Sequence, residues 1–318
     1  MSDAFDALAG LAPRTPVYLV DASLYVFRAW HSIPDDFTDR DGHPTNAVHG
    51  FTRFLLELIE RERPVHIAVA FDEALDSCFR NAFHPAYKAN REPAPDALRR
   101  QFAHCKAVCA ALGLAVLAHT DYEADDLIGS ARVAARAHGL RAVIVSADKD
   151  LSQLLEDDDE QWDFARSQRW TADGVHARHG VHAHQIADYL GLSGDAVDNI
   201  PGVPGIGTKT AAALLMHFGT LDAALERIDE ITYLRSIRGA AGIAAKLRAH
   251  RDQALLSRRL ATIALDAPFD LERVPFLRAA ACGETLGGLC ESLRFGPMTR
   301  RRLGQAAGLD LTPAPAAS

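Results

Sequence analysis

Aspartates follow three apolar, β-branched runs of the sequence, each at the point where a run ends. The aspartates are Asp21, Asp72, Asp148 and Asp150, and the runs are Val17–Val20, His66–Phe71 and Ala142–Ser146. In an open parallel α/β sheet, ligands bind beyond the carboxyl ends of the strands, so we expect the four carboxylates to converge on one edge. Two unit charges about 4 Å apart repel by roughly 4 kcal/mol at an effective dielectric constant near 20. The pattern therefore predicts a site whose charge is neutralised by divalent metal ions.

Two further acidic groups extend this interpretation. Their members are Glu123, Asp125 and Asp126 in the first group, and Asp195 and Asp198 in the second. The first group opens an expected helix, where the helix dipole favours negative charge and where residues i and i+3 share one face. The members of the second group are also three residues apart, so they could serve one cation. Asp148 and Asp150 lie on one face in extended geometry, which leaves Lys149 pointing away.

A glycine-rich loop over residues 202–207 leads directly into an expected helix over Thr208–Phe218. Its sequence is not that of a P-loop, because Thr208 intervenes before Lys209 and no strand precedes the loop. The backbone amides at the start of the helix, together with Lys209, form a sequence-independent clamp for a phosphate. The residues expected to contact nucleic acid here are Gly202, Gly205, Gly207, Thr208 and Lys209.

Basic residues are concentrated in a few segments, although the chain is acidic overall. The formal net charge is −8, which alone argues against a nucleic-acid partner, but the distribution of charge matters more than its sum. The segment YKANR places Tyr87, Lys88 and Arg91 between the acidic residues Asp72 and Glu123. A basic segment above an acidic metal site could grip a phosphodiester.

The alternation of apolar runs with amphipathic stretches predicts the elements that position these groups. Strands are expected over 17–20, 66–71, 115–118 and 142–146, and helices over 23–30, 46–62, 97–112 and 123–137. Strands that alternate with helices indicate a parallel sheet and an α/β fold. Hairpin-like segments follow within 160–180, and the later pattern is all helical. We expect a leader (1–16), an α/β domain (17–180), a helical domain (181–305) and a disordered tail (306–318).

Composition excludes several other classes of protein. No apolar run approaches the roughly 18 residues of a membrane helix, and the N-terminus lacks the basic and apolar regions of a signal peptide. A cytoplasmic protein without a membrane partner is expected. The five cysteines form no CxxC pair, and their odd number argues against a disulfide framework. We interpret them as idle thiols rather than zinc ligands.

Six motifs occur in a fixed order between about residues 17 and 270. They are VDASLYVFRAWH, AVAFD, FRNAFHPAYKANR, EADDLIG, SADKDLSQL and GDAVDNIPGVPGIGTKTAAALL. With these motifs the chain resembles the 5′–3′ exonuclease and flap endonuclease family, in particular the N-terminal nuclease domain of bacterial DNA polymerase I. One departure is Ala22, where a glycine is usual. The resemblance implies a PIN-like or Rossmann-like nuclease domain followed by helices, in a stand-alone form because no polymerase sequence follows.

The resemblance also assigns roles to residues. The acidic residues that match the family's metal ligands are Asp21, Asp72, Glu123, Asp125, Asp126, Asp148, Asp150, Asp195 and Asp198. They imply two Mg²⁺ ions, for which Mn²⁺ can substitute. The residues that match a helical arch (about 76–105), under which a free 5′ end passes, are Arg80, Tyr87, Lys88 and Arg91. Lys88 and Arg91 are expected to offset charge on the scissile phosphate. The loop 202–207 matches a helix–three-turn–helix element that holds duplex phosphates, with K⁺ on its carbonyls.

The expected activity is structure-specific hydrolysis of DNA by a two-metal mechanism, which leaves a 5′-phosphate and a 3′-hydroxyl. The expected substrates are 5′ flaps, 5′ ends and branched duplexes, cut by a monomer in replication and repair. Three alternatives are open. An aspartyl phosphatase would need DxDxT where the chain reads Asp21-Ala22-Ser23, and a ribonuclease domain would lack the GVPGIGTKT companion. A catalytically silent binder of branched DNA would gain nothing from the acidic residues.

Overall fold

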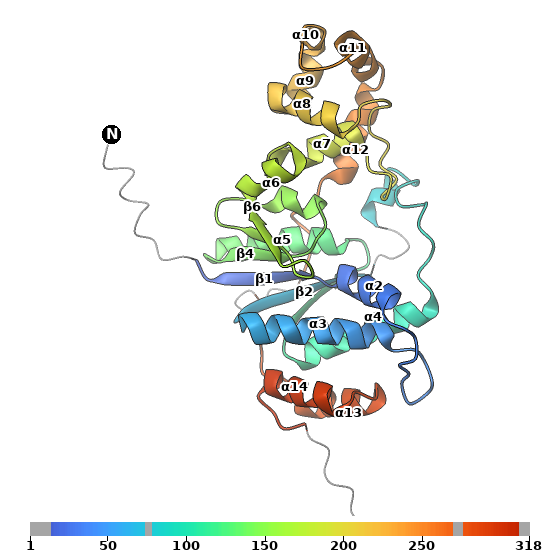
Figure 1. Cartoon of the computed structure of the whole chain (residues 1–318), viewed down its shortest axis with the longest axis vertical. Coiled ribbons are helices and arrows are strands. Elements are labelled where there is room, and N and C mark those ends of the chain that lie inside the picture. Colours follow the sequence, from blue (N-terminus) through green and yellow to red (C-terminus); the bar gives the residue numbers. More distant parts are fainter. Residues whose placement is uncertain (1–13, 74–77, 270–275, 312–318) are drawn as a thin grey trace, which may run out of the picture.

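The computed structural model describes residues 14–73, 78–269 and 276–311 (Figure 1). Within these ranges one sheet has the strand order β3-β2-β1-β4-β5-β6. The strands are β1 (Pro16–Asp21), β2 (His66–Asp72), β3 (Ala115–His119), β4 (Arg141–Val145), β5 (Glu160–Asp163) and β6 (Gln168–Thr171). Neighbouring strands are parallel except β6, which pairs antiparallel with β5. The predicted parallel sheet and the hairpin within 160–180 are confirmed.

Side chains of the central strands alternate between two apolar layers. Val17 and Leu19 of β1 pack into the layer that contains α5 (Ala124–Ala137), whereas Tyr18 and Val20 face the opposite layer. That opposite layer contains α2 (Ala22–Ser32), α3 (Asn46–Glu62) and α4 (Asp96–Ala111), as Figure 1 shows. Because helices cover both faces, the central strands are apolar throughout, as expected for a buried parallel sheet.

The chain after the sheet is helical, as predicted. The helices are α6 (Ala172–His179), α7 (Ile186–Ser193), α8 (Thr208–Phe218), α9 (Leu221–Glu226), α10 (Ile228–Ile231), α11 (Ala240–Ala249) and α12 (Arg251–Ala261). Helix α7 packs against α8 and α12 and joins this group to the sheet domain. No helix in the described ranges is both long and apolar enough to cross a membrane.

The last two helices return to the first domain. Helices α13 (Gly283–Ser292) and α14 (Pro297–Ala307) lie against α4 and α3, on the side away from α7–α12 (Figure 1). Leu286 and Leu303 are buried in the apolar layer of α3 and α4, and Arg302 forms a bidentate ion pair with Glu60 of α3 (2.7 and 2.8 Å). The expectation that residues 181–305 form one DNA-binding domain is therefore wrong for these two helices.

The ends of the described chain also differ from the expected boundaries. Strand β1 begins at Pro16, inside the expected leader, and residues 1–13 lie outside the described residues. Helix α14 extends to Ala307, and Gly308 ends it in a left-handed conformation (φ +68°), as glycine commonly does at this position. The expected disordered tail therefore does not begin at residue 306, and 312–318 lie outside the described residues.

The segment expected to form a helical arch divides into two parts. Residues 96–105 belong to α4, whose Leu98 and Phe102 are buried against the sheet. Among the described residues, 78–95 form only a short 3₁₀ turn over Phe79–Ala82, followed by turns. We call residues 78–95 the strap. Pro93 and Pro95 disfavour helical backbone just before them, which agrees with this break.

Candidate active site

The carboxyl ends of β1, β2 and β4 bring Asp21, Asp72 and Asp148 to one edge of the sheet. Asp21 accepts hydrogen bonds from a main-chain N–H in the first turn of α2 (3.2 Å) and from the Ser146 hydroxyl (2.8 Å). Asp72 accepts one from the Ala124 N–H at the start of α5 (2.7 Å). These donors orient the carboxylates, and each carboxylate keeps further lone pairs for a cation.

The carboxylates at this edge influence one another's protonation. Burial raises the pKa of Asp21 to about 7, and the charge of Asp72 contributes to the rise. Burial, followed by the charges of Asp148 and Asp21, raises the pKa of Asp125 well above its ordinary value. Both causes disfavour the ionised forms. The structure therefore brings four of the predicted metal ligands together as a set of carboxylates that a cation would stabilise. They are Asp21, Asp72, Asp125 and Asp148.

Further acidic residues, Asp148, Asp195 and Asp198, lie around Asp150. Its Oδ1 is buried and accepts no hydrogen bond from the described residues, although Lys149 Nζ lies 3.5 Å away. Burial and the charge of Asp148 raise the pKa of Asp150 to about 7, with smaller contributions from Asp198 and Asp195. A buried oxygen without a hydrogen bond requires an explanation, and a metal ion is one.

Lys149 points toward these acidic residues rather than away from them. Its ammonium group contacts Asp195 as well as Asp150. The expectation from extended geometry is wrong because Lys149 has helical backbone angles (φ −65°, ψ −27°) at the start of a 3₁₀ turn over Asp150–Leu154. Its position directly before Asp150 in the sequence is a signal for that contact, whereas no local pattern connects it with Asp195.

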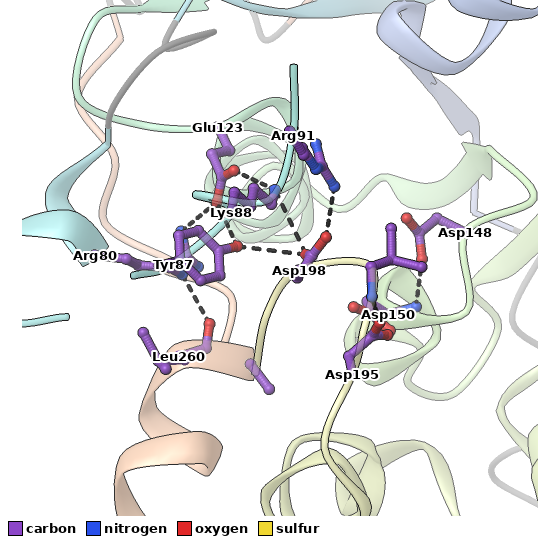
Figure 2. A network of polar contacts seen from close by, with 12 residues as sticks. Arg80, Tyr87, Lys88, Arg91, Glu123, Asp148, Asp150, Asp195, Asp198 and Leu260 are labelled. Atoms are coloured by element: carbon purple, nitrogen blue, oxygen red, sulfur yellow. Dashed lines mark hydrogen bonds and ion pairs between the residues drawn. The ribbon is translucent and has the colours of Figure 1, made fainter. Parts of the chain in front are cut away.

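The strap places two further cations over the acidic edge (Figure 2). Lys88 contacts Glu123 and lies 3.5 Å from Asp198 Oδ2, and Arg91 Nη2 lies 2.5 Å from Asp198 Oδ1. The Lys88 N–H also donates to the main-chain carbonyl of Asp198 (3.1 Å). Thus the residues predicted to meet the scissile phosphate are here paired with predicted metal ligands.

Arg80 and Asp126 form a buried structural pair instead of taking part in binding. Arg80 is 3% exposed, and its guanidinium also donates to the carbonyls of Leu260 (2.8 Å) and Thr262 (2.9 Å). Asp126 is 0% exposed, and both its oxygens accept from Arg80 and from main-chain N–H groups. The predictions that Arg80 contacts DNA and that Asp126 binds metal are therefore wrong.

Tyr87 and Glu123 belong to the same buried network. Tyr87 is 4% exposed and its hydroxyl donates to Glu123 Oε2 (3.0 Å). Contrary to the prediction, its ring is therefore not available to DNA. Burial alone would raise the pKa of Glu123, but Lys88 and Arg80 hold it below the ordinary value. Glu123 could therefore bind a metal ion only in exchange for part of this network.

The oxygen atoms of these acidic side chains fit a hard divalent cation, although in this structure the side chains do not surround a single position. Within the described residues, no three acidic, histidine or cysteine side chains are close enough to hold an ion as they stand. A cavity of about 10 Å³ lies among Glu123, Asp125, Asp150 and Asp198, close to the space of one water-sized particle. All-oxygen carboxylate donors favour Mg²⁺, Mn²⁺ or Ca²⁺. Closure of these carboxylates on an ion would replace the lysine contacts.

Gly202 is part of the fold of the glycine-rich loop and not of its surface. It is buried, its N–H donates to Ser257 Oγ (3.0 Å), and its carbonyl accepts from Gln253 Nε2 (2.7 Å). A Cβ at this position would overlap the backbone of Gly194. The prediction that Gly202 contacts DNA is therefore wrong, because its backbone groups are already bonded within the protein.

The other predicted loop residues lie on the surface. Gly205, Gly207, Thr208 and Lys209 are exposed at the start of α8, and their contact with DNA stays a prediction. The ammonium group of Lys246, on α11, lies where a Cβ of Gly205 would be. The loop therefore carries a second ammonium group, which no local pattern in the sequence connects with residue 205.

Two family models match consecutive parts of the chain. The 5′–3′ exonuclease N-terminal resolvase-like domain matches residues 16–180, and the 5′–3′ exonuclease C-terminal SAM fold matches residues 181–280. The chain belongs to the 5′–3′ exonuclease family. This confirms the resemblance inferred from the six ordered motifs.

Curated relatives agree with this family. DNA polymerase I of Pseudomonas aeruginosa is 41% identical over 286 residues, which cover 89% of this chain and 31% of that protein. DNA polymerase I of Rhizobium leguminosarum is 36% identical over 307 residues, which cover 94% and 29%. The chain thus spans about a third of the length of these relatives.

The fold of this chain is also similar to solved structures of other proteins. A T5 5′-exonuclease with bound zinc ions has a TM-score of 0.63 at 18% identity, with 93% of this chain and 99% of that chain covered. The catalytic core of Rad2 in complex with a DNA substrate has a TM-score of 0.57 at 12% identity, with 94% and 90% covered. At these identities the similarity shows a shared fold, including the order of the sheet domain and the helical domain.

Proposed function

We propose that the chain is a Mg²⁺-dependent 5′–3′ exonuclease and flap endonuclease that hydrolyses DNA phosphodiesters. The observation that carries the proposal is the convergence of buried and partly buried carboxylates at the carboxyl edge of the sheet, where Asp21, Asp125 and Asp150 have raised pKa values. Such a group is stabilised when cations neutralise it. When bound, two metal ions would supply an activated water and stabilise the leaving 3′ oxygen, so the products would be a 5′-phosphate and a 3′-hydroxyl.

In this proposal the acidic residues divide between two ions. Asp21, Asp72, Asp125 and Asp148 would hold the first, and Asp150, Asp195 and Asp198, with Asp148 between, would hold the second. Mn²⁺ would substitute for Mg²⁺ because both accept all-oxygen ligands. Glu123 would contribute after it releases Lys88.

Lys88 and Arg91 would change partners when substrate binds. Both are paired with acidic side chains in this structure. Once metal ions neutralise those carboxylates, the cations of the strap would be released to pair with the non-bridging oxygens of the scissile phosphate. Charge that develops on the phosphate would then be stabilised by groups already positioned above it.

The exposed start of α8 would bind the phosphate backbone of the DNA duplex. Free N–H groups at a helix N-terminus and the Lys209 ammonium group both attract phosphates. Specificity would then be for 5′ flaps, 5′ ends and branched duplexes rather than for base sequence. K⁺ would bind main-chain carbonyls of the loop 202–207. The Lys246 ammonium group beside Gly205 is a competing cation there. We also propose that the protein acts as a cytoplasmic monomer in replication and repair.

The decisive experiment uses a 5′-labelled DNA flap and a matched blunt duplex, each with Mg²⁺ and with EDTA. We expect metal-dependent cutting near the flap junction, and none in EDTA. Binding to the flap without cutting under Mg²⁺ or Mn²⁺ would instead identify the alternative, a catalytically silent protein that binds branched DNA. The Asp150→Asn variant serves as the control for contaminating nucleases.

A further inference from the structure

A cavity of about 270 Å³ lies on the α2–α3 side of the sheet, outside the acidic edge. Helices α2 and α3 and the turn between β5 and β6 form its walls. Its lining includes Tyr25, Arg28, Ser32, Arg53, Phe54 and Phe164. Its volume is close to the lower end, about 300 Å³, of sites for small organic ligands. The cavity can therefore accept one small ligand but no duplex.

One wall of the cavity is aromatic. The rings of Tyr25 and Phe54 are stacked, with centroids 3.7 Å apart and planes 7° apart. Phe164 meets Phe54 edge to face at 5.1 Å. Aromatic surfaces of this kind bind planar rings such as nucleobases without selecting among them.

The polar groups of the cavity include two arginines, and two of its polar atoms lack a hydrogen bond. Arg28 Nη1 and the Tyr25 hydroxyl are buried and make no hydrogen bond of good geometry with the described residues, although the Phe164 amide lies near the hydroxyl. Tyr25 is 4% exposed. The lining contains two arginines, Arg28 and Arg53, and one acidic residue, Glu57. A buried polar group without a partner, such as Arg28 Nη1, usually marks a missing ligand or water, and guanidinium groups suit a phosphate.

We propose that this cavity binds a single nucleotide unit, with the base against the partly buried Phe54 and the phosphate bound by Arg28 and Arg53. The hydroxyls of Ser32 and Ser167 in the lining would bond the sugar or the base. Tyr25 follows Asp21 by four residues on α2, which is about one helical turn. The cavity therefore neighbours the acidic edge and is separate from it.

Two sources could supply this ligand. One is a free 5′-mononucleotide, which the proposed exonuclease reaction would release, and this source rests on the proposed function. The other is an unpaired nucleotide within a DNA strand held at the neighbouring acidic edge. Both present the same base and phosphate, so the binding itself does not depend on cleavage.

Binding can be measured by saturation-transfer NMR and by calorimetry with thymidine 5′-monophosphate, with EDTA present. Without metal ions the acidic edge repels phosphate, so a saturable signal reports a different site. We expect thymidine without phosphate to bind about tenfold more weakly, as for loss of a charge-assisted contact. Arg28→Gln and Arg53→Gln should each lose about tenfold in affinity, and Ser32→Trp should abolish binding by filling the cavity. Arg301→Gln, an exposed arginine on α14, is the matched control and should bind like the unmodified protein.

A short 5′-phosphorylated thymidine oligonucleotide distinguishes the sources. If it displaces the mononucleotide and loses affinity in Ser32→Trp, the ligand is an unpaired nucleotide of a strand; if it fails to compete, the ligand is the free mononucleotide. Absence of binding by both probes, or equal binding by Arg28→Gln and Arg53→Gln with unchanged circular dichroism, would overturn the inference. A protein that cuts flaps but binds neither probe would overturn this inference alone and leave the proposed function intact.

Discussion

Arg80 and Asp126 form a bidentate ion pair, with Nη1–Oδ2 and Nη2–Oδ1 distances of 2.7 and 2.8 Å, in a part of the molecule where neither residue is more than 3% exposed. The pair joins the strap to α5. The same guanidinium reaches the carbonyls of Leu260 and Thr262 at the end of α12. One side chain therefore connects the strap, the sheet domain and the helical domain.

Replacement of Arg80 by alanine should lower the free energy of unfolding by about 3–5 kcal/mol, because it leaves the Asp126 charge buried without a partner. Urea denaturation followed by circular dichroism measures the change. Arg91→Ala, which removes a half-exposed arginine of the same strap, should cost no more than about 1 kcal/mol. Equal losses in the two variants would contradict the structural role assigned to Arg80.

Asp150→Asn should abolish cleavage of a DNA flap while DNA binding survives, because it removes one charge from the proposed second metal site and keeps the shape of the side chain. Single-turnover cleavage with Mg²⁺ and fluorescence anisotropy with the same flap measure the two effects. Asp173→Asn, at an exposed position on α6, should change neither. Turnover at the unmodified rate in Asp150→Asn would refute the assignment of this residue.

Lys88→Ala should slow cleavage far more than it weakens binding, since Lys88 lies above the acidic edge and makes few contacts elsewhere. Loss of one positioned charge at a transition state typically costs about 10²–10³-fold in rate. The rate constant of the chemical step and the dissociation constant for the flap should be measured on the same preparation. If both fall by the same factor, Lys88 is a docking contact.

Without metal ions the protein should become less stable as the pH rises. The pKa values of Asp21 and Asp150 are raised from 3.8 to about 7 in the folded state, so their contribution to stability is fully present below pH 3.8 and is lost as the pH rises through about 7. In EDTA the melting temperature should therefore be lower at pH 8 than at pH 6.

Metal ions should reverse this trend, because they bind the ionised carboxylates and only the folded state holds the site. Mg²⁺ or Mn²⁺ should raise the melting temperature more at pH 8 than at pH 6. In the double variant Asp21→Asn, Asp150→Asn, both the pH dependence in EDTA and the effect of metal should shrink. A metal effect of the same size at both pH values would argue against binding by these carboxylates.

Much of the fold could be predicted from the sequence because its central strands are buried on both faces. Such strands appear as continuous apolar runs, and the aspartate that follows each run marks the edge of the sheet. Helices α3 and α8 have the predicted bounds, since amphipathic periodicity and the glycines or prolines beside them specify both ends.

The remaining features depend on contacts between distant residues. Periodicity shows that α13 and α14 have an apolar face, but it does not show that this face covers α3 and α4. Asp126 shares a helix face with Glu123 as predicted, yet its partner is a buried arginine in the strap. Likewise, a glycine-rich loop exposes amides in general, whereas Gly202 is enclosed by Ser257 and Gln253.

The return of α13 and α14 to the first domain has a consequence for the order in which the chain folds. Synthesis proceeds from the N-terminus, and domains generally fold as they emerge. The strands β1–β6 of the described sheet all precede residue 172. Leu286 and Leu303, which complete the apolar layer of α3 and α4, are made after helices α7–α12. Until α13 and α14 have been synthesised, the sheet domain therefore exposes part of the apolar surface of α3 and α4 to water. Its core is completed last, although its strands are made first.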